Sequence, residues 1–285
     1  MAIEPEDSGA APSAGMSLTL GHLYPDQLNI YGDRGNIIVF RRRCAWRGIE
    51  LRVVPLGLGD VLVPDAYDLV FIGGGQDKEQ TEIAEDLRAT KAEGLWAAVE
   101  DGAPVLAVCG GYQLLQHGYR PAEGPMLKGI GVFDAETVHP GKRVARCIGN
   151  IAIRWGETTI VGFENHGGRT YLGSGAAPLG RVLAGHGNNS KDRGEGAIYR
   201  NAYGTYIHGS LLPKNPHVAD ALLQIALRRR YGPEVTLPPL DDALEWQAHE
   251  GMLRRLGVTP LARPSTVIAP KPAAAGPRSA EGSRV

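Results

Sequence analysis

Two short apolar runs, each ending in glycines, most limit what this sequence can fold into. They are "YDLVFIGGG" (67–75) and "APVLAVCGG" (103–111), and a helical pattern at about 79–101 separates them. Continuous apolar runs of this length are typical of strands that are buried on both faces. Upstream, the same alternation predicts a strand, a helix and a second strand at 17–23, 35–48 and 50–58. The pattern predicts an α/β fold, a mostly parallel sheet with helices on both faces.

The second half of the chain has a different pattern. The stretches "RCIGNIAIRW", "TTIVGFENHGG" and "GAIYRNAYGTYIHG" are rich in β-formers and glycine, and they predict further strands joined by long loops. Helices are predicted at about 215–231 and 241–257. The Ala, Pro and Ser content of the two ends predicts disorder. We therefore expect three segments: a disordered extension (1–16), a single domain (17–256) and a disordered Pro/Ala-rich tail (257–285).

Composition excludes several classes of function. The formal net charge of the 285 residues is -1, so no overall field attracts nucleic acid or an anionic membrane. No apolar stretch reaches the roughly 18 to 20 residues of a membrane span, and the start of the chain lacks a secretion signal. We therefore expect a cytoplasmic protein without a membrane segment. The three cysteines contain no C-x-x-C pair, which predicts free thiols and no metal site.

Cys109 occupies a position typical of a nucleophile. It ends the apolar run "VLAVC", and a helix is predicted to begin directly behind it. Strand, tight turn and helix form a nucleophile elbow at the carboxyl edge of a parallel sheet, where ligands bind. Gly110 and Gly111 would let the backbone turn sharply, and a helix N-terminus favours the reactive thiolate. A lone cysteine in an apolar run is more often a small core residue, so the neighbours of Cys109 decide between the two interpretations.

A thiolate that attacks a carbonyl needs a base and oxyanion donors. His208 follows a β-like run and precedes a glycine, so it is the first candidate for the base. His166, in "GFENHGGRT", is the second. Backbone N–H groups of the "GGGQD" loop (73–77) and of Gly110 are candidates for the oxyanion hole, although the three glycines are equally typical of a flexible turn.

Several stretches together resemble a known family. "CGGYQLL", the preceding Gly-rich loop and a strand-end histidine 99 residues downstream resemble the class I (triad-type) glutamine amidotransferase domain, which has a flavodoxin-like α/β fold. A narrower resemblance rests on "GFENHGGRTYLG" (162–173), "GHGNN" (185–189) and "NAYGTYIHGSLLPKNPHVAD" (201–220). It is to the GatD glutaminase subunits of lipid II isoglutaminyl synthase, which are CobB/CobQ-like. The resemblance spans residues 17 to 232.

The resemblance implies hydrolysis of L-glutamine to glutamate and ammonia. Cys109 would attack the side-chain amide, and His208 would act as general acid and base. An oxyanion hole would come from Gly74 or Gly75 with Gly110. Substrate-binding residues would be Gln113, Asn165, His166 and an arginine for the glutamine α-carboxylate, because a guanidinium holds a carboxylate with two bonds. Arg146 is the first choice for that arginine, and Arg143 is the second.

One position departs from the wider family. Many class I amidotransferases carry His-x-Glu, in which the Glu orients the imidazole, whereas this chain reads His208-Gly209-Ser210. The CobB/CobQ-like branch also lacks this Glu. The orienting acid is therefore unassigned, and we expect a partner subunit to supply it or to tighten the site.

The resemblance also implies a partner. The chain has no G-x-x-x-x-G-K-[ST] phosphate loop and no room for a synthetase domain. We expect a MurT-like Mur-ligase-type synthetase subunit that holds ATP and Mg²⁺ and amidates the D-glutamate of lipid II in peptidoglycan synthesis, with no cofactor in this chain. Three alternatives remain open: the glutaminase part of a cobyric acid synthase-like enzyme, a stand-alone γ-glutamyl cysteine hydrolase, and a non-catalytic binding module.

Overall fold

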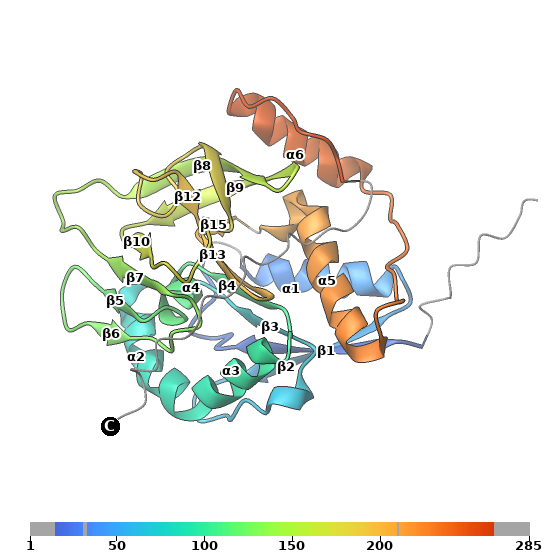
Figure 1. Ribbon diagram of the computed structural model, residues 1–285, viewed down its shortest axis with the longest axis horizontal. Helices are drawn as coiled ribbons and strands as arrows, with labels where there is room; N and C mark the ends of the chain where they lie inside the picture. The colour runs from blue at the N-terminus through green and yellow to red at the C-terminus, as the bar shows by residue number, and fades with distance from the viewer. Residues whose placement is uncertain (1–14, 31–32, 210, 265–285) are drawn as a thin grey trace, which may run out of the picture.

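The computed structural model describes residues 15–30, 33–209 and 211–264, and it has the α/β architecture predicted above (Figure 1). Its central sheet has six strands in the order β13-β14-β4-β3-β1-β2. Five of them run parallel, and β13 at one edge is antiparallel. The strands of this sheet are β1 (Ser17–Leu23), β2 (Glu50–Leu56), β3 (Leu69–Ile72), β4 (Val105–Val108), β13 (Ala197–Tyr199) and β14 (Ala202–Thr205).

Helices cover both faces of the central sheet. In Figure 1, α1 and α5 lie on one face, and α2 and α3 lie on the other. Strands β3 and β4 are buried along their whole length, which explains why their sequences are continuously apolar. The helices are α1 (Arg34–Ala45), α2 (Asp77–Asp86), α3 (Ala92–Glu100), the short α4 (Gly110–Leu114), α5 (Pro216–Tyr231) and α6 (Ala243–Arg255), with 3₁₀ turns at Pro64–Ala66 and Leu212–Lys214.

The helical stretch predicted at about 79–101 is confirmed. It runs without a break through α2, a π-helical turn at Leu87–Lys91 and α3. The Lys91 side chain is fully buried, because its ammonium group pairs with Asp86 at 2.7 Å and lies over the ring of Tyr24. The Asp86–Lys91 pair spans the π turn, and the contact with Tyr24 joins the turn to the loop after β1.

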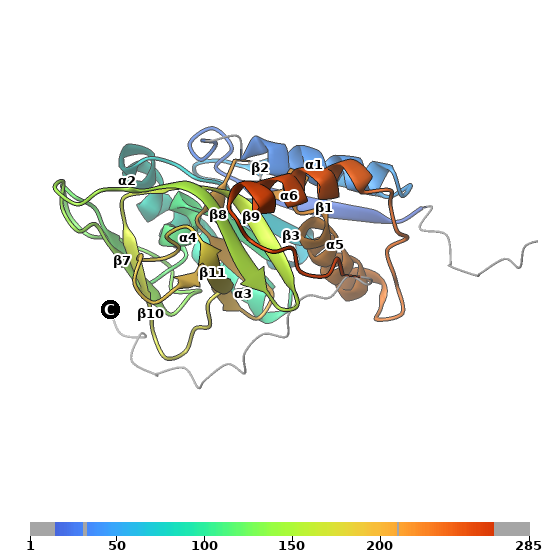
Figure 2. The same cartoon turned by 90° about the horizontal axis from the view of Figure 1, so that it is seen from above.

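The β-rich second half builds two further sheets, which sequence patterns did not separate from the central one. One has the order β10-β7-β5-β6 and the other β12-β11-β8-β9-β15. Helix α6 packs on the second of these through Leu253, against Ala152 and Val161 (Figure 2). The strands are β5 (Gly118–Arg120), β6 (Leu127–Lys128), β7 (Ala135–Val138), β8 (Cys147–Trp155), β9 (Thr158–His166), β10 (Arg169–Leu172), β11 (Gly180–Ala184), β12 (Gly194–Glu195) and β15 (Ile207–His208).

A buried ionic cluster ties both ends of the domain together. Arg43 of α1 pairs with Asp220 of α5 and with Asp242, just before α6, each at 2.6 Å. Arg47 pairs with Asp220 as well. Residues 1–14 and 265–285 lie outside the described part of the chain, so the predicted boundaries at 17 and 256 stay predictions. Arg263, within the predicted tail, contacts Glu250 of α6.

Candidate active site

Four loops that follow neighbouring strands meet at the carboxyl edge of the central sheet. Asp33 follows β1, Gly74 follows β3, Cys109 follows β4, and His208 follows β14 by way of β15. Since β14, β4, β3 and β1 are adjacent in that order, their carboxyl ends lie side by side. This edge is where open parallel sheets bind ligands.

Cys109 stands at a strained turn between β4 and α4. Its φ of 49° and ψ of -103° lie where a residue with a side chain is rarely found, which is typical of a nucleophile elbow. Its N–H donates to the carbonyl of Thr205 at 2.8 Å. A Cβ on Gly110 would lie 2.9 Å from the nitrogen of Gly75, and one on Gly111 would lie 2.8 Å from the carbonyl oxygen of Gly73. Both glycines are therefore required by close backbone approach.

The other two cysteines are not placed for reaction. Cys44 and Cys147 are free and buried, as the sequence predicted. Burial raises the pKa of Cys44 to about 12 and also raises the pKa of Cys147, so both are protonated at neutral pH. Cys109 alone lies beside a histidine at the sheet edge.

His208 is fully buried between an acid and the nucleophile. Its Nδ1 lies 3.4 Å from Oδ1 of Asp33. Burial by itself would lower the pKa of His208, but the neighbouring Cys109 sulfur and the Asp33 carboxylate together raise it to about 10. The imidazole is therefore protonated near neutral pH, as a histidine paired with a thiolate would be.

Asp33 is a candidate for the orienting acid that sequence reasoning did not find. It is fully buried, and its second oxygen accepts the N–H of Gly74 at 2.7 Å. Many class I amidotransferases carry a Glu two residues after the histidine, whereas here a carboxylate from the loop after β1, 175 residues away, lies beside His208. That a partner subunit supplies an acid or tightens the site stays a prediction. The available signal was "YGDRGN" (31–36), which places an aspartate in the loop between a predicted strand and the predicted helix at 35–48.

The structure separates the three glycines proposed for the oxyanion hole. The N–H of Gly74 is occupied by Asp33, so Gly74 serves the acid rather than an oxyanion. A Cβ on Gly74 would lie 2.9 Å from His208 and 3.3 Å from Cys109, which keeps this position a glycine. Gly75 and Gly110 approach each other closely, since a Cβ on Gly110 would lie 2.9 Å from the nitrogen of Gly75. The N–H groups of these two glycines remain the candidates for the oxyanion hole.

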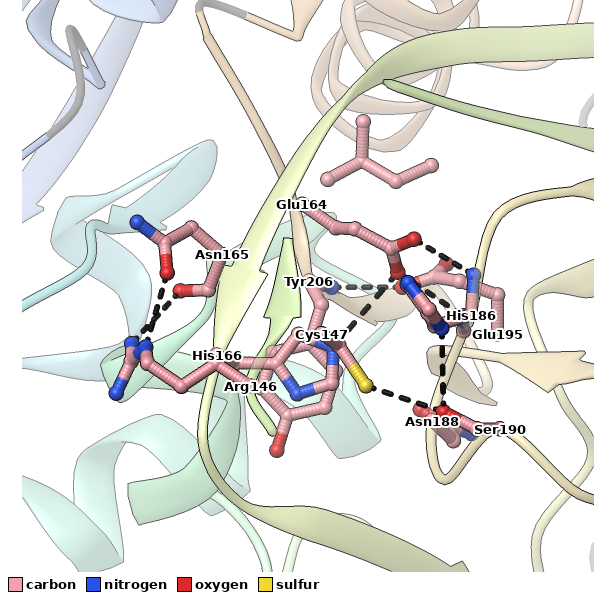
Figure 3. A network of polar contacts seen from close by, with 12 residues as sticks. Arg146, Cys147, Glu164, Asn165, His166, His186, Asn188, Ser190, Glu195 and Tyr206 are labelled. Atoms are coloured by element: carbon pink, nitrogen blue, oxygen red, sulfur yellow. Dashed lines mark hydrogen bonds and ion pairs between the residues drawn. The ribbon is translucent and has the colours of Figure 1, made fainter. Parts of the chain in front are cut away.

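Arg146, directly before β8, lies next to Asn165 of β9 (Figure 3). Nε of exposed Arg146 donates to Oδ1 of Asn165 at 3.1 Å, and Nη2 donates to the Asn165 carbonyl at 3.3 Å. Phe163 pairs with His208 in the β9–β15 register, so Asn165, two residues further along β9, faces the same side as His208. Arg143 is also exposed, and no hydrogen bond or ion pair is found for it within the described residues.

His166 and Gln113 are held in the wall of the site. His166 faces the opposite side of β9 from Asn165, stacks on Tyr206 at 3.7 Å, and contacts the Gly168 carbonyl through Nδ1. The buried Gln113 accepts from Gln80 at 3.0 Å and donates to the Tyr206 hydroxyl at 3.1 Å. These contacts give both side chains partners within the chain, and their expected role in substrate binding stays a prediction.

Arg169 is a functional candidate that sequence reasoning missed. It is buried, and it donates to the carbonyls of Gly167, Gly168 and Ala145. It thereby holds the turn after β9 next to the residue that precedes Arg146. The signal was present in "ENHGGRT", where an arginine follows two glycines.

Metal and membrane features are absent from the described parts of the chain. In residues 15–30, 33–209 and 211–264, no three His, Cys, Asp or Glu side chains gather as ligands for a metal ion. Within the same ranges no helix combines the length and apolar character needed to cross a bilayer.

Comparison with known proteins identifies the family. The model of the CobB/CobQ-like glutamine amidotransferase domain matches residues 19–216. The chain belongs to this family. This CobB/CobQ-like amidotransferase is 42% identical over 240 residues to the GatD subunit of the glutamine-hydrolysing lipid II isoglutaminyl synthase of Staphylococcus aureus, covering 84% of this chain and 96% of the relative. It is 40% identical to the GatD subunit of Streptococcus pneumoniae, covering 82% and 89%. The resemblance inferred from the sequence is confirmed.

Two more distant matches concern the cobyric acid synthase alternative and the fold. The amidotransferase is 33% identical to the cobyric acid synthase of Pelotomaculum thermopropionicum, but the match covers only 57% of this chain and 32% of that protein. The structure of PurLQS from Thermotoga maritima superposes with a TM-score of 0.51 at 17% identity, covering 84% of this chain and all of the other. That likeness supports the predicted class I amidotransferase fold.

Proposed function

We propose that this amidotransferase is the glutaminase subunit of a lipid II isoglutaminyl synthase. The observation that carries the proposal is the line of Asp33, His208 and Cys109 at the sheet edge, in a chain that aligns with nearly the full length of two GatD subunits. The site is suited to acyl transfer through a thiolate, and the names of the two relatives support lipid II as the acceptor. The ammonia would convert the D-glutamate of lipid II to D-isoglutamine in peptidoglycan synthesis.

The geometry supports a thioester mechanism. The Cys109 thiolate attacks the side-chain carbonyl carbon of glutamine, and the N–H groups of Gly75 and Gly110 face the developing oxyanion. The His208 imidazolium then donates its proton to the amide nitrogen, the carbon–nitrogen bond breaks, and ammonia leaves. His208, now neutral, takes a proton from water, whose oxygen attacks the thioester carbon and releases glutamate and the Cys109 thiolate. Asp33 keeps the imidazole oriented throughout. Arg146 would bind the glutamine α-carboxylate, beside Asn165.

A partner subunit would receive the ammonia. Ammonia released into neutral water is mostly protonated and is then a poor nucleophile, so a glutaminase benefits from direct transfer to a synthetase. We propose a MurT-like, Mur-ligase-type partner that holds ATP and Mg²⁺, and a cytoplasmic location for the complex.

Copurification with a Mur-ligase-like partner tests the proposal. The complex should release glutamate from glutamine and amidate lipid II in the presence of ATP. Cys109→Ala should abolish the glutamine-dependent reaction but leave amidation with added ammonium. A Cys109→Ala complex that still uses glutamine would contradict the mechanism, and a wild-type complex that amidates a cobyric-acid precursor instead of lipid II would favour the cobyric acid synthase alternative.

A further inference from the structure

The chain changes sheets immediately before His208. Strand β14 ends at Thr205 in the central sheet, whereas β15 begins at Ile207 and pairs with β9 in the five-stranded sheet. Tyr206 lies between the two strands. At this crossing, side chains rather than a neighbouring strand accept the N–H groups of Tyr206 and Ile207. A buried N–H without an acceptor would destabilise the crossing, so these side chains help determine its geometry.

Glu195 supplies the main acceptor at the crossing (Figure 3). Its side chain is fully buried, and its Oε1 accepts the N–H of Tyr206 at 2.7 Å. Both carboxyl oxygens lie 3.2 Å from the Thr205 hydroxyl oxygen, which itself accepts the N–H of Ile207 at 3.0 Å. The Glu195 carboxyl group therefore contacts Thr205 and Tyr206 directly, and it contacts Ile207 through the Thr205 hydroxyl.

The segment held by Glu195 also contacts the nucleophile. The Thr205 carbonyl accepts the N–H of Cys109 at 2.8 Å, so the backbone of Cys109 is fixed by the residue whose hydroxyl Glu195 binds. On the other side, the segment leads directly into His208. The two halves of the reacting pair, which come from different strands, share this one support.

We propose that Glu195 is a positioning residue for Cys109 and His208, acting through the backbone of residues 205–207. The proposal rests on the glutaminase function proposed above. Glu195 does not contact the reacting sulfur, so its effect is on the orientation of the pair. A displacement of about 1 Å between reacting groups can cost on the order of 100-fold in rate.

The protonation of Glu195 determines the choice of variants. Burial raises the pKa of Glu195 to about 8, and the nearby Glu164 adds to the rise. The neutral carboxyl therefore predominates near neutral pH, and a glutamine of the same shape can accept from Tyr206 and donate to Thr205. Glu195→Gln is the conservative variant, and Glu195→Ala removes the acceptor.

Glu164 provides a matched control in the same sheet. It is also fully buried, and it accepts two backbone N–H groups, those of His186 at 2.6 Å and Gly187 at 2.9 Å. Those groups belong to the loop after β11 and not to the crossing. Glu164→Ala therefore removes an equivalent buried acceptor without releasing residues 205–207.

Two measurements on the full-length variants test the proposal: kcat and KM for glutamine, and the rate of Cys109 alkylation by iodoacetamide from about pH 5 to about pH 9, followed by peptide mass spectrometry. Glu195→Ala should lower kcat and alkylation by about 30-fold with KM little changed, and Glu195→Gln should stay within about 3-fold of wild type. Glu164→Ala should lower the melting temperature but keep both rates within about 3-fold.

Equal losses in Glu195→Ala and Glu164→Ala, or a Glu195→Ala loss confined to KM, would overturn the proposal. If Glu195→Ala does not fold, Glu195→Asp replaces it: its shorter side chain should slow alkylation by about 10-fold, and an unchanged rate would be contrary to the proposal. Alkylation does not depend on glutamine. A wild-type protein that fails to hydrolyse glutamine but shows the alkylation differences would therefore remove the proposed function and keep the positioning role.

Discussion

The carboxylate of Asp33 lies 3.4 Å from Nδ1 of His208, although 175 residues separate the two in sequence. The same carboxylate holds the N–H of Gly74 at 2.7 Å, so one side chain fixes both the imidazole and the Gly-rich loop. The carboxylate beside the histidine therefore comes from the loop after β1 instead of from the strand that carries the histidine.

Asp33→Asn should lower kcat for glutamine hydrolysis by about 10- to 100-fold with little change in KM. Asparagine can still accept from Gly74 through its oxygen, but its amide group then faces Nδ1 and favours the wrong imidazole tautomer. Steady-state glutamate release by the variant measures the effect. An unchanged kcat would mean that another acid, for example from a partner subunit, orients His208.

Arg146→Ala should raise KM for glutamine by about 10- to 100-fold while kcat changes little, because a bidentate contact to the α-carboxylate would be lost. Arg143→Ala is the matched control, since Arg143 is also exposed and lies three residues away. Initial rates over a range of glutamine concentrations distinguish them. If Arg143→Ala shows the larger increase, the second choice of the sequence analysis is the carboxylate ligand.

Gly110→Ala should lower kcat by about 100-fold or more, because the new Cβ would lie 2.9 Å from the nitrogen of Gly75 and would separate the two oxyanion donors. Gly251→Ala in α6 is the control, since its nearest neighbour would be an Arg254 side-chain nitrogen at 3.8 Å, and alanine favours the helix. Glutamine hydrolysis and thermal melting of both variants should be compared. Full activity of Gly110→Ala would exclude this oxyanion hole.

Unfolding should become easier as the pH falls from 6.5 to about 3, partly because of His217. Burial, with a contribution from His249, lowers the pKa of His217 from 6.5 to about 3, so the folded state requires the neutral ring. The unfolded state therefore binds more protons than the folded state between pH 6.5 and about pH 3. The contribution of His217 to the free energy of unfolding is fully present above pH 6.5. Acidification to about pH 3 removes an amount on the order of 4 kcal/mol.

His217→Phe should flatten that dependence in urea unfolding curves followed by Trp fluorescence. Phenylalanine can keep the stacking on Trp246, which lies 5.0 Å from the His217 ring. Some dependence should remain, because burial also lowers the pKa of His22 to about 4. A variant with the same slope as wild type would show that His217 is not a source of acid sensitivity.

Local sequence signals predicted the elements that depend on local chemistry. β1 was predicted with its observed bounds, and α5 begins one residue after the predicted start. Cys109 could also be placed, because its strand, its glycines and its helix are contiguous in sequence. The π turn at Leu87–Lys91 could not be predicted, because the contact of Lys91 with the ring of Tyr24 depends on packing.

The remaining parts of the site depend on which strands become neighbours. Asp33 is an ordinary loop acid until β1, β3, β4 and β14 are ordered in one sheet, and sequence periodicity does not predict the order of strands. His166 and Asn165 are adjacent in a family motif, but strand alternation sends their side chains to opposite faces. The sequence resemblance assigns both residues to substrate binding. The register between β9 and β15 places only Asn165 on the same side as His208.

The hydrogen bond between the Thr205 carbonyl and the Cys109 N–H also has a consequence during protein synthesis. The chain emerges from the ribosome N-terminus first, so Cys109 is exposed well before its neighbouring strand β14 (Ala202–Thr205) exists. In that interval β4 has an open edge and the thiol has no His208 beside it. Long-range pairings of this kind form late in folding. The nascent protein therefore carries Cys109 without its histidine, and the proposed reacting pair is complete only when the last part of the domain has been added.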